Sequence, residues 1–236
     1  MADWPRAVIF DFDGVLVHSE PLHYLAFKSV ADREHLTLTE DLYYNELIGY
    51  DDRGVVLKLL QLNKKPTTPA VLLRLLAEKQ EIARRLIHEK KFEALAGVEE
   101  VVRGLWRNYP LAICSGAIAS EIELMLDAVR LRDCFRLIIS ADDVAVGKPD
   151  PACYLKCIAD LGQQLGEKLS PKDCIVFEDA PRVIDRLKPL GFACVGVAGH
   201  IPESRFEGAS AIVTGLTPEQ IKSKLPQLEL YEELKP

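Results

Sequence analysis

The amino-acid sequence predicts an α/β fold in which a doubly wound parallel sheet carries an inserted helical domain. Along residues 97–225, short apolar runs alternate with amphipathic stretches, which is typical of a parallel sheet with helices on both faces. The first apolar run is instead followed by a long stretch with helical spacing and no convincing strand. We therefore expect a discontinuous sheet domain at 1–17 and 93–236, and a helical domain at 18–92.

The predicted strands are apolar without alternation, as expected for strands that are buried on both faces of a parallel sheet. The amphipathic stretches that follow them predict the helices that cover the sheet. The first inserted helix begins after Ser19, with Glu20 and Pro21 in its first turn, a favourable helix start. The predicted strands are 7–12, 111–114, 137–139, 174–177, 194–197 and 211–213, and the predicted helices are 21–34, 41–47, 52–62, 69–91, 98–109, 119–129, 151–161 and 181–190.

The composition argues against several kinds of partner. The chain has 29 Lys and Arg against 36 Asp and Glu in 236 residues, a net charge of −7, and so no basic field for nucleic acid or anionic lipid. No segment approaches the roughly 18 apolar residues of a membrane span, and the N-terminus has no signal-peptide pattern. The six cysteines form no CxxC pair and are expected to be reduced and structural. We expect a cytoplasmic protein that binds neither nucleic acid nor membranes.

Polar residues follow the predicted strands at their carboxyl ends, where the active sites of open parallel sheets lie. The first strand ends in Asp11-Phe12-Asp13-Gly14, Ser115-Gly116 follows the second, and Gly147-Lys148-Pro149 precedes a helix. The strand at 174–177 ends in Glu178-Asp179. Carboxylates that lie close together raise each other's pKa, whereas a hard divalent ion such as Mg²⁺ holds them ionised. The sequence therefore predicts a divalent cation at this edge of the sheet.

These residues resemble the four motifs of the haloacid dehalogenase-like (HAD) superfamily of phosphotransferases. The chain is similar to the subgroup with a helical cap inserted after the first strand, which includes the β-phosphoglucomutase-like phosphatases. A single Asp-x-Asp pair is a weak signal, but four motifs in order are specific, and the resemblance covers essentially the whole chain. It implies a Rossmann-like core with an α-helical cap domain, and hydrolysis of a small-molecule phosphomonoester. The motifs are Asp11-Phe12-Asp13-Gly14-Val15, Ser115, Lys148-Pro149 and Glu178-Asp179.

The resemblance implies catalytic roles for two aspartates. Asp11 would be the nucleophile and would form an aspartyl-phosphate, which splits one difficult step into two easier ones. Asp13 would protonate the leaving oxygen and then take a proton from the hydrolytic water. An extended strand returns its side chains to the same side after two residues, which suits this division of roles.

The resemblance also implies which residues hold the metal and the phosphate. Lys148 would offset the charge of the phosphoryl group, and Ser115 with the amide of Gly116 would donate hydrogen bonds to its oxygens. Taken alone, Lys148 fits a surface lysine better, but its place between Gly147 and Pro149 favours the phosphate role. The Mg²⁺ ligands would be Asp11, the backbone carbonyl of Asp13, Asp179 and, directly or through water, Glu178.

In the helical domain, His23 falls where phosphomutases of this subgroup carry a histidine that couples cap closure to acid-base chemistry. A histidine that packs or caps a helix explains the position equally well. Arg53 and Lys79 are candidates to reach an anionic group of the substrate. Exposed helices of this composition contain many such residues, so each is a weak candidate.

Asp13 argues against a dehalogenase, because a halide leaves without a proton. A mutase must grip a second phosphate, but Ala117 and Ala119 stand where β-phosphoglucomutases have Ser and Asn after the residue equivalent to Ser115. Val183 stands where relatives usually have glycine. We therefore expect a Mg²⁺-dependent phosphatase that acts on a small phosphomonoester, such as a sugar phosphate, through an aspartyl-phosphate. A β-phosphoglucomutase-type mutase and a catalytically silent binding protein of the same fold are the alternatives.

Overall fold

The computed structural model describes residues 4–47, 50, 52–199 and 201–231. The chain divides into two compact units. Met1–His18 and Glu93–Pro236 form the core unit, and Ser19–Phe92 forms the helical unit. We propose that these units are the two predicted domains, with the first boundary after His18 instead of after residue 17.

The core unit contains a six-stranded parallel sheet with the order β5-β4-β1-β6-β7-β8. β1 lies at its centre, and Phe10 of β1 is in register with Ile113 of β4 and Phe177 of β6. The residues that follow these three strands therefore lie at one edge of the sheet. The strands are β1 Ala7–Phe10, β4 Leu111–Cys114, β5 Phe135–Ile139, β6 Cys174–Glu178, β7 Ala193–Val197 and β8 Ala211–Val213.

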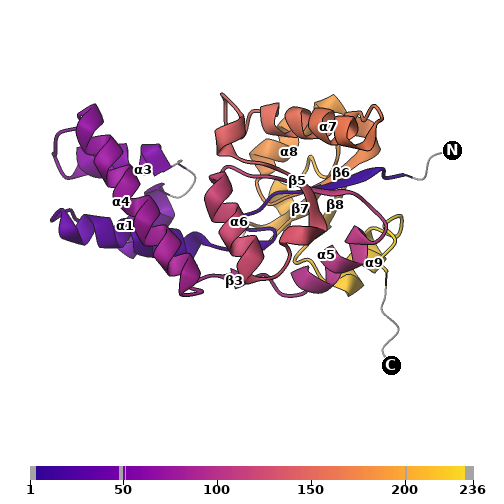
Figure 1. The fold of residues 1–236 in the computed structure, drawn as a ribbon, viewed down its shortest axis with the longest axis horizontal. Helices are drawn as coiled ribbons and strands as arrows, with labels where there is room; N and C mark the ends of the chain where they lie inside the picture. Colours follow the sequence, from indigo (N-terminus) through magenta and orange to yellow (C-terminus); the bar gives the residue numbers. More distant parts are fainter. Residues whose placement is uncertain (1–3, 48–49, 51, 200, 232–236) are drawn as a thin grey trace. The chain divides into compact units, whose positions relative to one another are not determined.

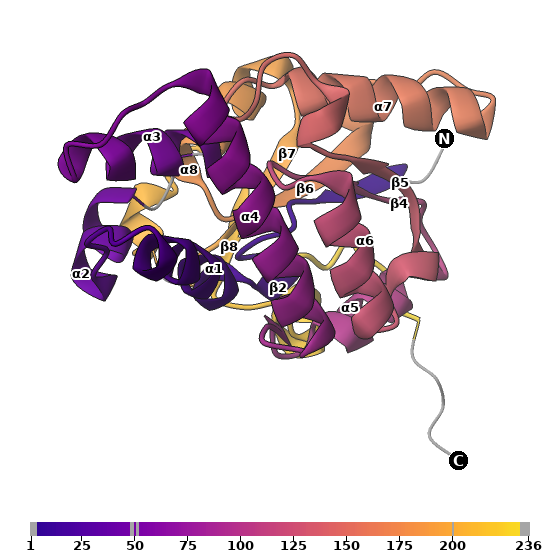
Figure 2. The ribbon, with the colours of Figure 1, turned by 60° about the vertical axis from the view of Figure 1, so that its left-hand side comes forward.

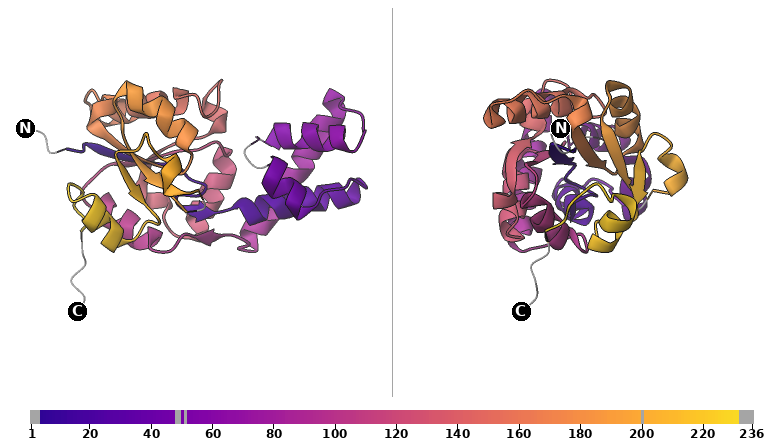
Figure 3. Two further views of the ribbon diagram at one scale, coloured as in Figure 1. Left: turned by 180° about the vertical axis from the view of Figure 1, so that it is seen from behind. Right: turned by 90° about the vertical axis from the view of Figure 1, so that its right-hand side faces the viewer.

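Helices cover both faces of the sheet, as Figures 1 and 3 show. Ile9 and Val176 point to the face covered by α7 and α8, where they join one buried apolar cluster. Strand alternation points Phe10 the other way, and its ring stacks on Phe177 with the centroids 5.0 Å apart. The helices of the core unit are α5 Val98–Trp106, α6 Ala119–Ala128, α7 Ala152–Leu165, α8 Pro181–Leu187 and α9 Pro218–Lys224. Short 3₁₀ turns occur at Arg132–Cys134, Ala141–Asp143, Pro171–Asp173, Lys188–Leu190 and Glu203–Arg205.

The helical unit is built around two long helices, α1 (Glu20–Arg33) and α4 (Pro69–His88), which pack against each other (Figure 2). α3 (Asp52–Leu62) also packs on α4. The structure corrects the helix predicted at 41–47: a three-residue α2 (Glu40–Leu42) is followed by a π-helical turn at Tyr43–Leu47. This wider turn buries the ring of Tyr43, whose hydroxyl donates to Glu20 Oε1 at 2.6 Å.

Two short strands flank the helical unit in the sequence. β2 (Val17–His18) pairs antiparallel with β3 (Glu93–Ala94), and both belong to the core unit. Two-residue strands have no measurable periodicity, which is why the sequence does not predict them. None of the helices in the described parts of the chain combines the length and apolar character needed to cross a bilayer. All six cysteines are buried with free thiols.

Candidate active site

The acidic residues of the site follow two neighbouring strands. β1 and β6 pair in parallel, and the amide of Asp11 donates to the carbonyl of Phe177 at 2.8 Å. Asp11 therefore lies beside Glu178, the last residue of β6, and beside Asp179. One carboxylate oxygen from each of these three residues lies within 4.8 Å of the other two. Tertiary structure thus joins residues that are far apart in the sequence into one acidic cluster.

A single buried lysine bridges two members of this cluster. Lys148, from the loop before α7, places Nζ 2.7 Å from Asp11 Oδ1 and 2.8 Å from Glu178 Oε2. The Glu178 side chain is completely buried, and only 15% of the Lys148 side chain is exposed. A buried charge needs a partner, so the lysine and the two carboxylates depend on each other.

The cluster carries more negative charge than Lys148 can balance. Burial and the charge of Glu178 raise the pKa of Asp11 well above its ordinary value, against the attraction of Lys148. Burial and Glu178 also raise the pKa of Asp179 to about 7. Burial opposes ionisation of Glu178 as well, but its contacts with Lys148 hold its pKa below the ordinary value. A second cation at this site would relieve the repulsion.

The donor set fits a hard divalent cation. Asp11, Glu178 and Asp179 offer three carboxylate oxygens within 4.8 Å of one another. Mg²⁺ prefers oxygen ligands and is commonly held by a few carboxylates together with water and phosphate oxygens. The described residues therefore provide a candidate metal-binding cluster at the carboxyl edge of the sheet.

The turn after β1 brings the backbone against this cluster. Gly14 has a φ of +77°, and a Cβ at this position would lie 2.0 Å from Asp179 Oδ2. Glycine is required here both for the left-handed conformation and for the close approach. The neighbouring Asp13 is partly exposed, and its charge contributes to the raised pKa of Asp179, which places it beside the cluster.

Ser115 and Gly116 follow β4, the strand on the other side of β1. The amide of Ser115 donates to the carbonyl of Ile139 at 2.9 Å, and Ser115 Oγ accepts from the amide of Ala117 at 3.0 Å. The serine is buried, and its position is fixed by both contacts. Gly116 has open space around the position of a Cβ, so packing does not require glycine there.

The N-terminus of α6, which follows this loop, is capped by a residue that the sequence did not indicate. The amide of Ala119, the first residue of α6, donates to Asp142 Oδ2 at 3.0 Å. Asp142 lies in the turn after β5, whose backbone also reaches the Ser115 loop, since Ala141 N donates to the carbonyl of Ala117 at 2.9 Å. The first amide of this helix therefore donates its hydrogen bond to a carboxylate.

The candidate residues of the helical unit fall into two groups. Lys79 is fully buried, and its Nζ lies 2.7 Å from Asp52 Oδ2 and 3.0 Å from His23 Nδ1. These contacts argue against a direct contact of Lys79 with substrate. Because the ammonium donates to Nδ1, the hydrogen of the neutral ring is placed on Nε2. Burial and the charge of Lys79 lower the pKa of His23 to about 3. Arg53 is exposed on α3.

Sequence reasoning missed one residue in the centre of the site. Tyr154 on α7 is completely buried, and its hydroxyl donates to Glu178 Oε2 at 2.5 Å. In the sequence it is indistinguishable from the apolar residues of the same helix face, which pack against the sheet. Val183, which replaces the expected glycine, is buried in the same apolar cluster and packs α8 against the sheet.

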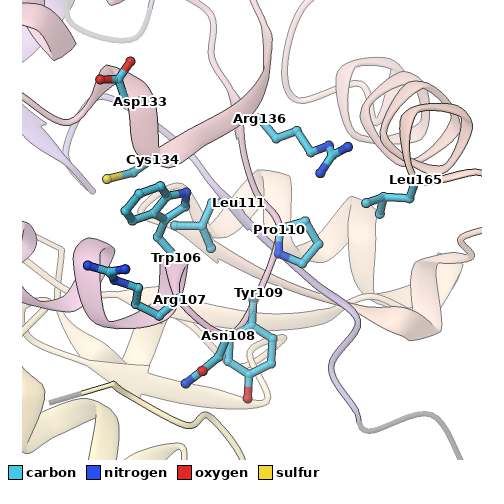
Figure 4. Close-up of a pocket in the computed structure, with 10 residues that line it drawn as sticks. All are labelled: Trp106, Arg107, Asn108, Tyr109, Pro110, Leu111, Asp133, Cys134, Arg136 and Leu165. Atoms are coloured by element: carbon cyan, nitrogen blue, oxygen red, sulfur yellow. The ribbon is translucent and has the colours of Figure 1, made fainter.

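A concave region of about 390 Å³ lies elsewhere, at the residues that precede β4 and β5 (Figure 4). These strands carry Ser115 and Ser140 at their other ends, so the region is separated from the acidic cluster by the length of the strands. Arg107, one of its residues, packs over the rings of Trp106 and Tyr231. The region is lined by Trp106, Arg107, Asn108, Tyr109, Pro110, Leu111, Asp133, Cys134, Arg136 and Leu165.

The fold is an α/β fold with a parallel sheet, and a cluster of carboxylates with a lysine lies at the carboxyl edge of that sheet. The sequence profile described as "Haloacid dehalogenase-like hydrolase" matches residues 8–197. The chain belongs to this family.

Two relatives of this chain are phosphatases. The phosphorylated carbohydrates phosphatase of Thermotoga maritima is 28% identical over 94% of this chain and 99% of its own length. The fructose-1-phosphate phosphatase YqaB of Escherichia coli is 30% identical over 80% of this chain and 95% of its own. The crystal structure of CbbY from Rhodobacter sphaeroides in complex with phosphate has the same fold, with a TM-score of 0.80 and 21% identity over 94% of this chain and 98% of that chain. Family and relatives together identify a phosphoric monoester hydrolase.

Proposed function

We propose that this chain is a Mg²⁺-dependent phosphatase that hydrolyses a small phosphomonoester, a sugar phosphate, through an aspartyl-phosphate intermediate. The observation that carries the proposal is the position of Asp11. Its carboxylate follows the central strand, pairs with Lys148 at 2.7 Å and lies in one cluster with Glu178 and Asp179. This arrangement supports a nucleophile that acts beside a buried cation and candidate metal ligands.

Asp11 is oriented before any substrate arrives. Its Oδ1 accepts hydrogen bonds from Lys148 Nζ and from the amide of Phe12, each at 2.7 Å. In the first step Asp11 attacks phosphorus, and the bond from phosphorus to the leaving oxygen breaks. Asp13, two residues further on, gives its proton to the leaving oxygen and regains one from the water that hydrolyses the aspartyl-phosphate.

The remaining polar groups would bind the phosphoryl oxygens. Lys148 supplies a positive charge, and the hydroxyl of Ser115 and the amide of Gly116 supply hydrogen-bond donors. Bound Mg²⁺ would add positive charge where the phosphoryl group is transferred. Its ligands would be Asp11, the backbone carbonyl of Asp13, Asp179 and, directly or through water, Glu178.

Two observations favour hydrolysis over phosphoryl transfer within a bisphosphate. Ala117 and Ala119 provide no side-chain donors after Ser115, and Asp142 occupies the amide of Ala119 at 3.0 Å. A carboxylate at this helix N-terminus disfavours a second phosphate there. The names of the two relatives, which act on phosphorylated carbohydrates and on fructose 1-phosphate, support a sugar phosphate as the substrate.

Phosphate release from a panel of sugar phosphates and other phosphomonoesters, with Mg²⁺ or with a chelator, tests the proposal. We expect Mg²⁺-dependent release by the wild-type chain and none by Asp11→Asn. Asp160→Asn, which alters a partly exposed aspartate on α7, is the matched control and should keep its activity. Near-normal phosphate release by Asp11→Asn would contradict the assignment of Asp11 as the nucleophile. Phosphate release that the chelator does not affect would contradict the dependence on Mg²⁺. Isomerisation of β-glucose 1-phosphate without phosphate release would establish the mutase instead.

A further inference from the structure

Tyr154 makes a short contact to Glu178. Its hydroxyl lies 2.5 Å from Glu178 Oε2, and no part of the tyrosine is exposed. The contact is a hydrogen bond from a neutral phenol to a carboxylate, a charge-assisted bond that is stronger than one between neutral groups. Tyr154 is thus bonded directly to a residue of the candidate metal site.

Both carboxylate oxygens of Glu178 accept hydrogen bonds within the core unit. Oε2 accepts from Tyr154 and from Lys148 Nζ at 2.8 Å, and Oε1 accepts from the amide of Ala180 at 3.1 Å. Rotation of the carboxylate would break these bonds. Lys148 divides its charge between Glu178 and Asp11, whereas the only hydrogen bond of the Tyr154 hydroxyl among the described contacts is to Glu178.

The ring that carries this hydroxyl is held by the core. Tyr154 belongs to the apolar cluster between α7, α8 and the sheet, and the Phe192 ring meets it edge-on with the centroids 6.2 Å apart. The Lys148 ammonium lies 5.0 Å from the centroid of the tyrosine ring, close enough for a cation-π contact. The hydroxyl is therefore a fixed donor, and a phenylalanine at this position would keep the packing without the donor.

We propose that Tyr154 is a positioning residue of the metal site, whose hydroxyl fixes the Glu178 carboxylate and thereby strengthens the binding of a divalent cation by Asp11, Glu178 and Asp179. This inference rests on the proposed Mg²⁺-dependent function. Hydrogen bonds to metal ligands from outside the coordination sphere set ligand orientation, and their loss weakens metal affinity by roughly 10–100-fold.

The test is the Mg²⁺ affinity of Tyr154→Phe, measured on the metal-free full chain by isothermal titration calorimetry. We expect the Kd for Mg²⁺ to rise by about 10-fold or more. In phosphate-release assays, the KM for Mg²⁺ should rise by a larger factor than kcat falls. Phe192→Leu is the matched control, because it removes a ring contact of Tyr154 and keeps the hydroxyl. It should lower the Tm and leave the Kd for Mg²⁺ unchanged.

A Kd of Tyr154→Phe within twofold of the wild-type value would overturn the inference, as would an equal loss of affinity in Phe192→Leu, since packing would then explain the effect. If those results accompany Mg²⁺-dependent phosphate release by the wild-type chain, the proposed function stands and only the role of Tyr154 falls. If the wild-type chain itself binds no Mg²⁺, the metal dependence of the proposed function fails together with the inference.

Discussion

Lys148→Met tests whether the lysine is the cation that holds the acidic cluster together without metal. The methionine keeps the length of the side chain over the Tyr154 ring but removes the charge. Asp11 and Glu178 lose their ion pairs at 2.7 and 2.8 Å, and neither is well exposed to water. The three carboxylates of the cluster then lie within 4.8 Å of one another without a cation.

The size of the effect follows from the burial of this ion pair. Removal of one partner of a buried pair costs about 3–5 kcal/mol, because the remaining charge is left uncompensated. For a unit of this size, each kcal/mol lowers the Tm by roughly 2–4 °C, so a loss on the order of 10 °C is expected in the presence of chelator. The loss should shrink toward pH 5, because Asp11 and Asp179, whose pKa values are raised, become neutral by protonation.

Thermal unfolding with chelator and with Mg²⁺ measures both parts of this prediction. Mg²⁺ should raise the Tm of Lys148→Met more than that of the wild-type chain, since it replaces the missing positive charge. The control is Lys156→Met, which removes a partly exposed i,i+4 pair with Asp160 on α7 and should lower the Tm only slightly. Equal Tm values for the two variants in chelator would refute the reasoning.

Four further predictions concern the same site and the helical unit. Asp13→Asn should reduce phosphate release most for substrates with poor leaving groups, and a uniform change in KM alone would contradict its acid-base role. Gly14→Ala should weaken Mg²⁺ binding measured by calorimetry, because its Cβ would lie 2.0 Å from Asp179 Oδ2. Since the pKa of Asp11 is raised and that of Asp179 is about 7, Mg²⁺ binding at pH 7 should release protons, measured by calorimetry in buffers of different ionisation enthalpy; affinity should rise with pH through 7, and zero release would refute the raised pKa values. The pKa of His23 is about 3 in the folded chain and 6.5 in its ordinary state, so the unfolded chain takes up a proton below pH 6.5 that the folded chain does not. Stability in urea should therefore be complete above pH 6.5 and fall by up to about 2 kcal/mol at pH 5, and His23→Gln should remove this part of the pH dependence.

The sequence predicts the sheet and its acidic edge because both are local patterns. Strands buried on both faces are unbroken apolar runs, and the candidate site carboxylates Asp11 and Glu178 stand directly at their ends. The same logic finds Ser115 at the end of β4. Lys148 is found only through the resemblance, because a lysine in a loop has no local signal for its partners.

The rest depends on contacts between distant parts of the chain. In the sequence, Lys79 on α4 is one of many helix lysines. Only the structure shows that its Nζ lies 2.7 Å from Asp52 Oδ2 on α3. In the sequence, Tyr154 resembles any other core residue. Only the structure shows that its hydroxyl donates to Glu178 Oε2. Tertiary packing decides both pairs, so neither propensity nor periodicity could have predicted them. The π-helical turn escaped prediction for the same reason.

The central place of β1 has a consequence for biosynthesis. β1 is complete at Phe10, but its neighbours β4 and β6 begin only at Leu111 and Cys174. The ribosome adds roughly 5–20 residues per second, so on the order of ten seconds pass between the synthesis of β1 and that of its second partner, β6. The helical unit, which is complete at Phe92, has time to fold in that interval. This fully buried central strand is therefore exposed to pairing with other chains until β6 has been translated.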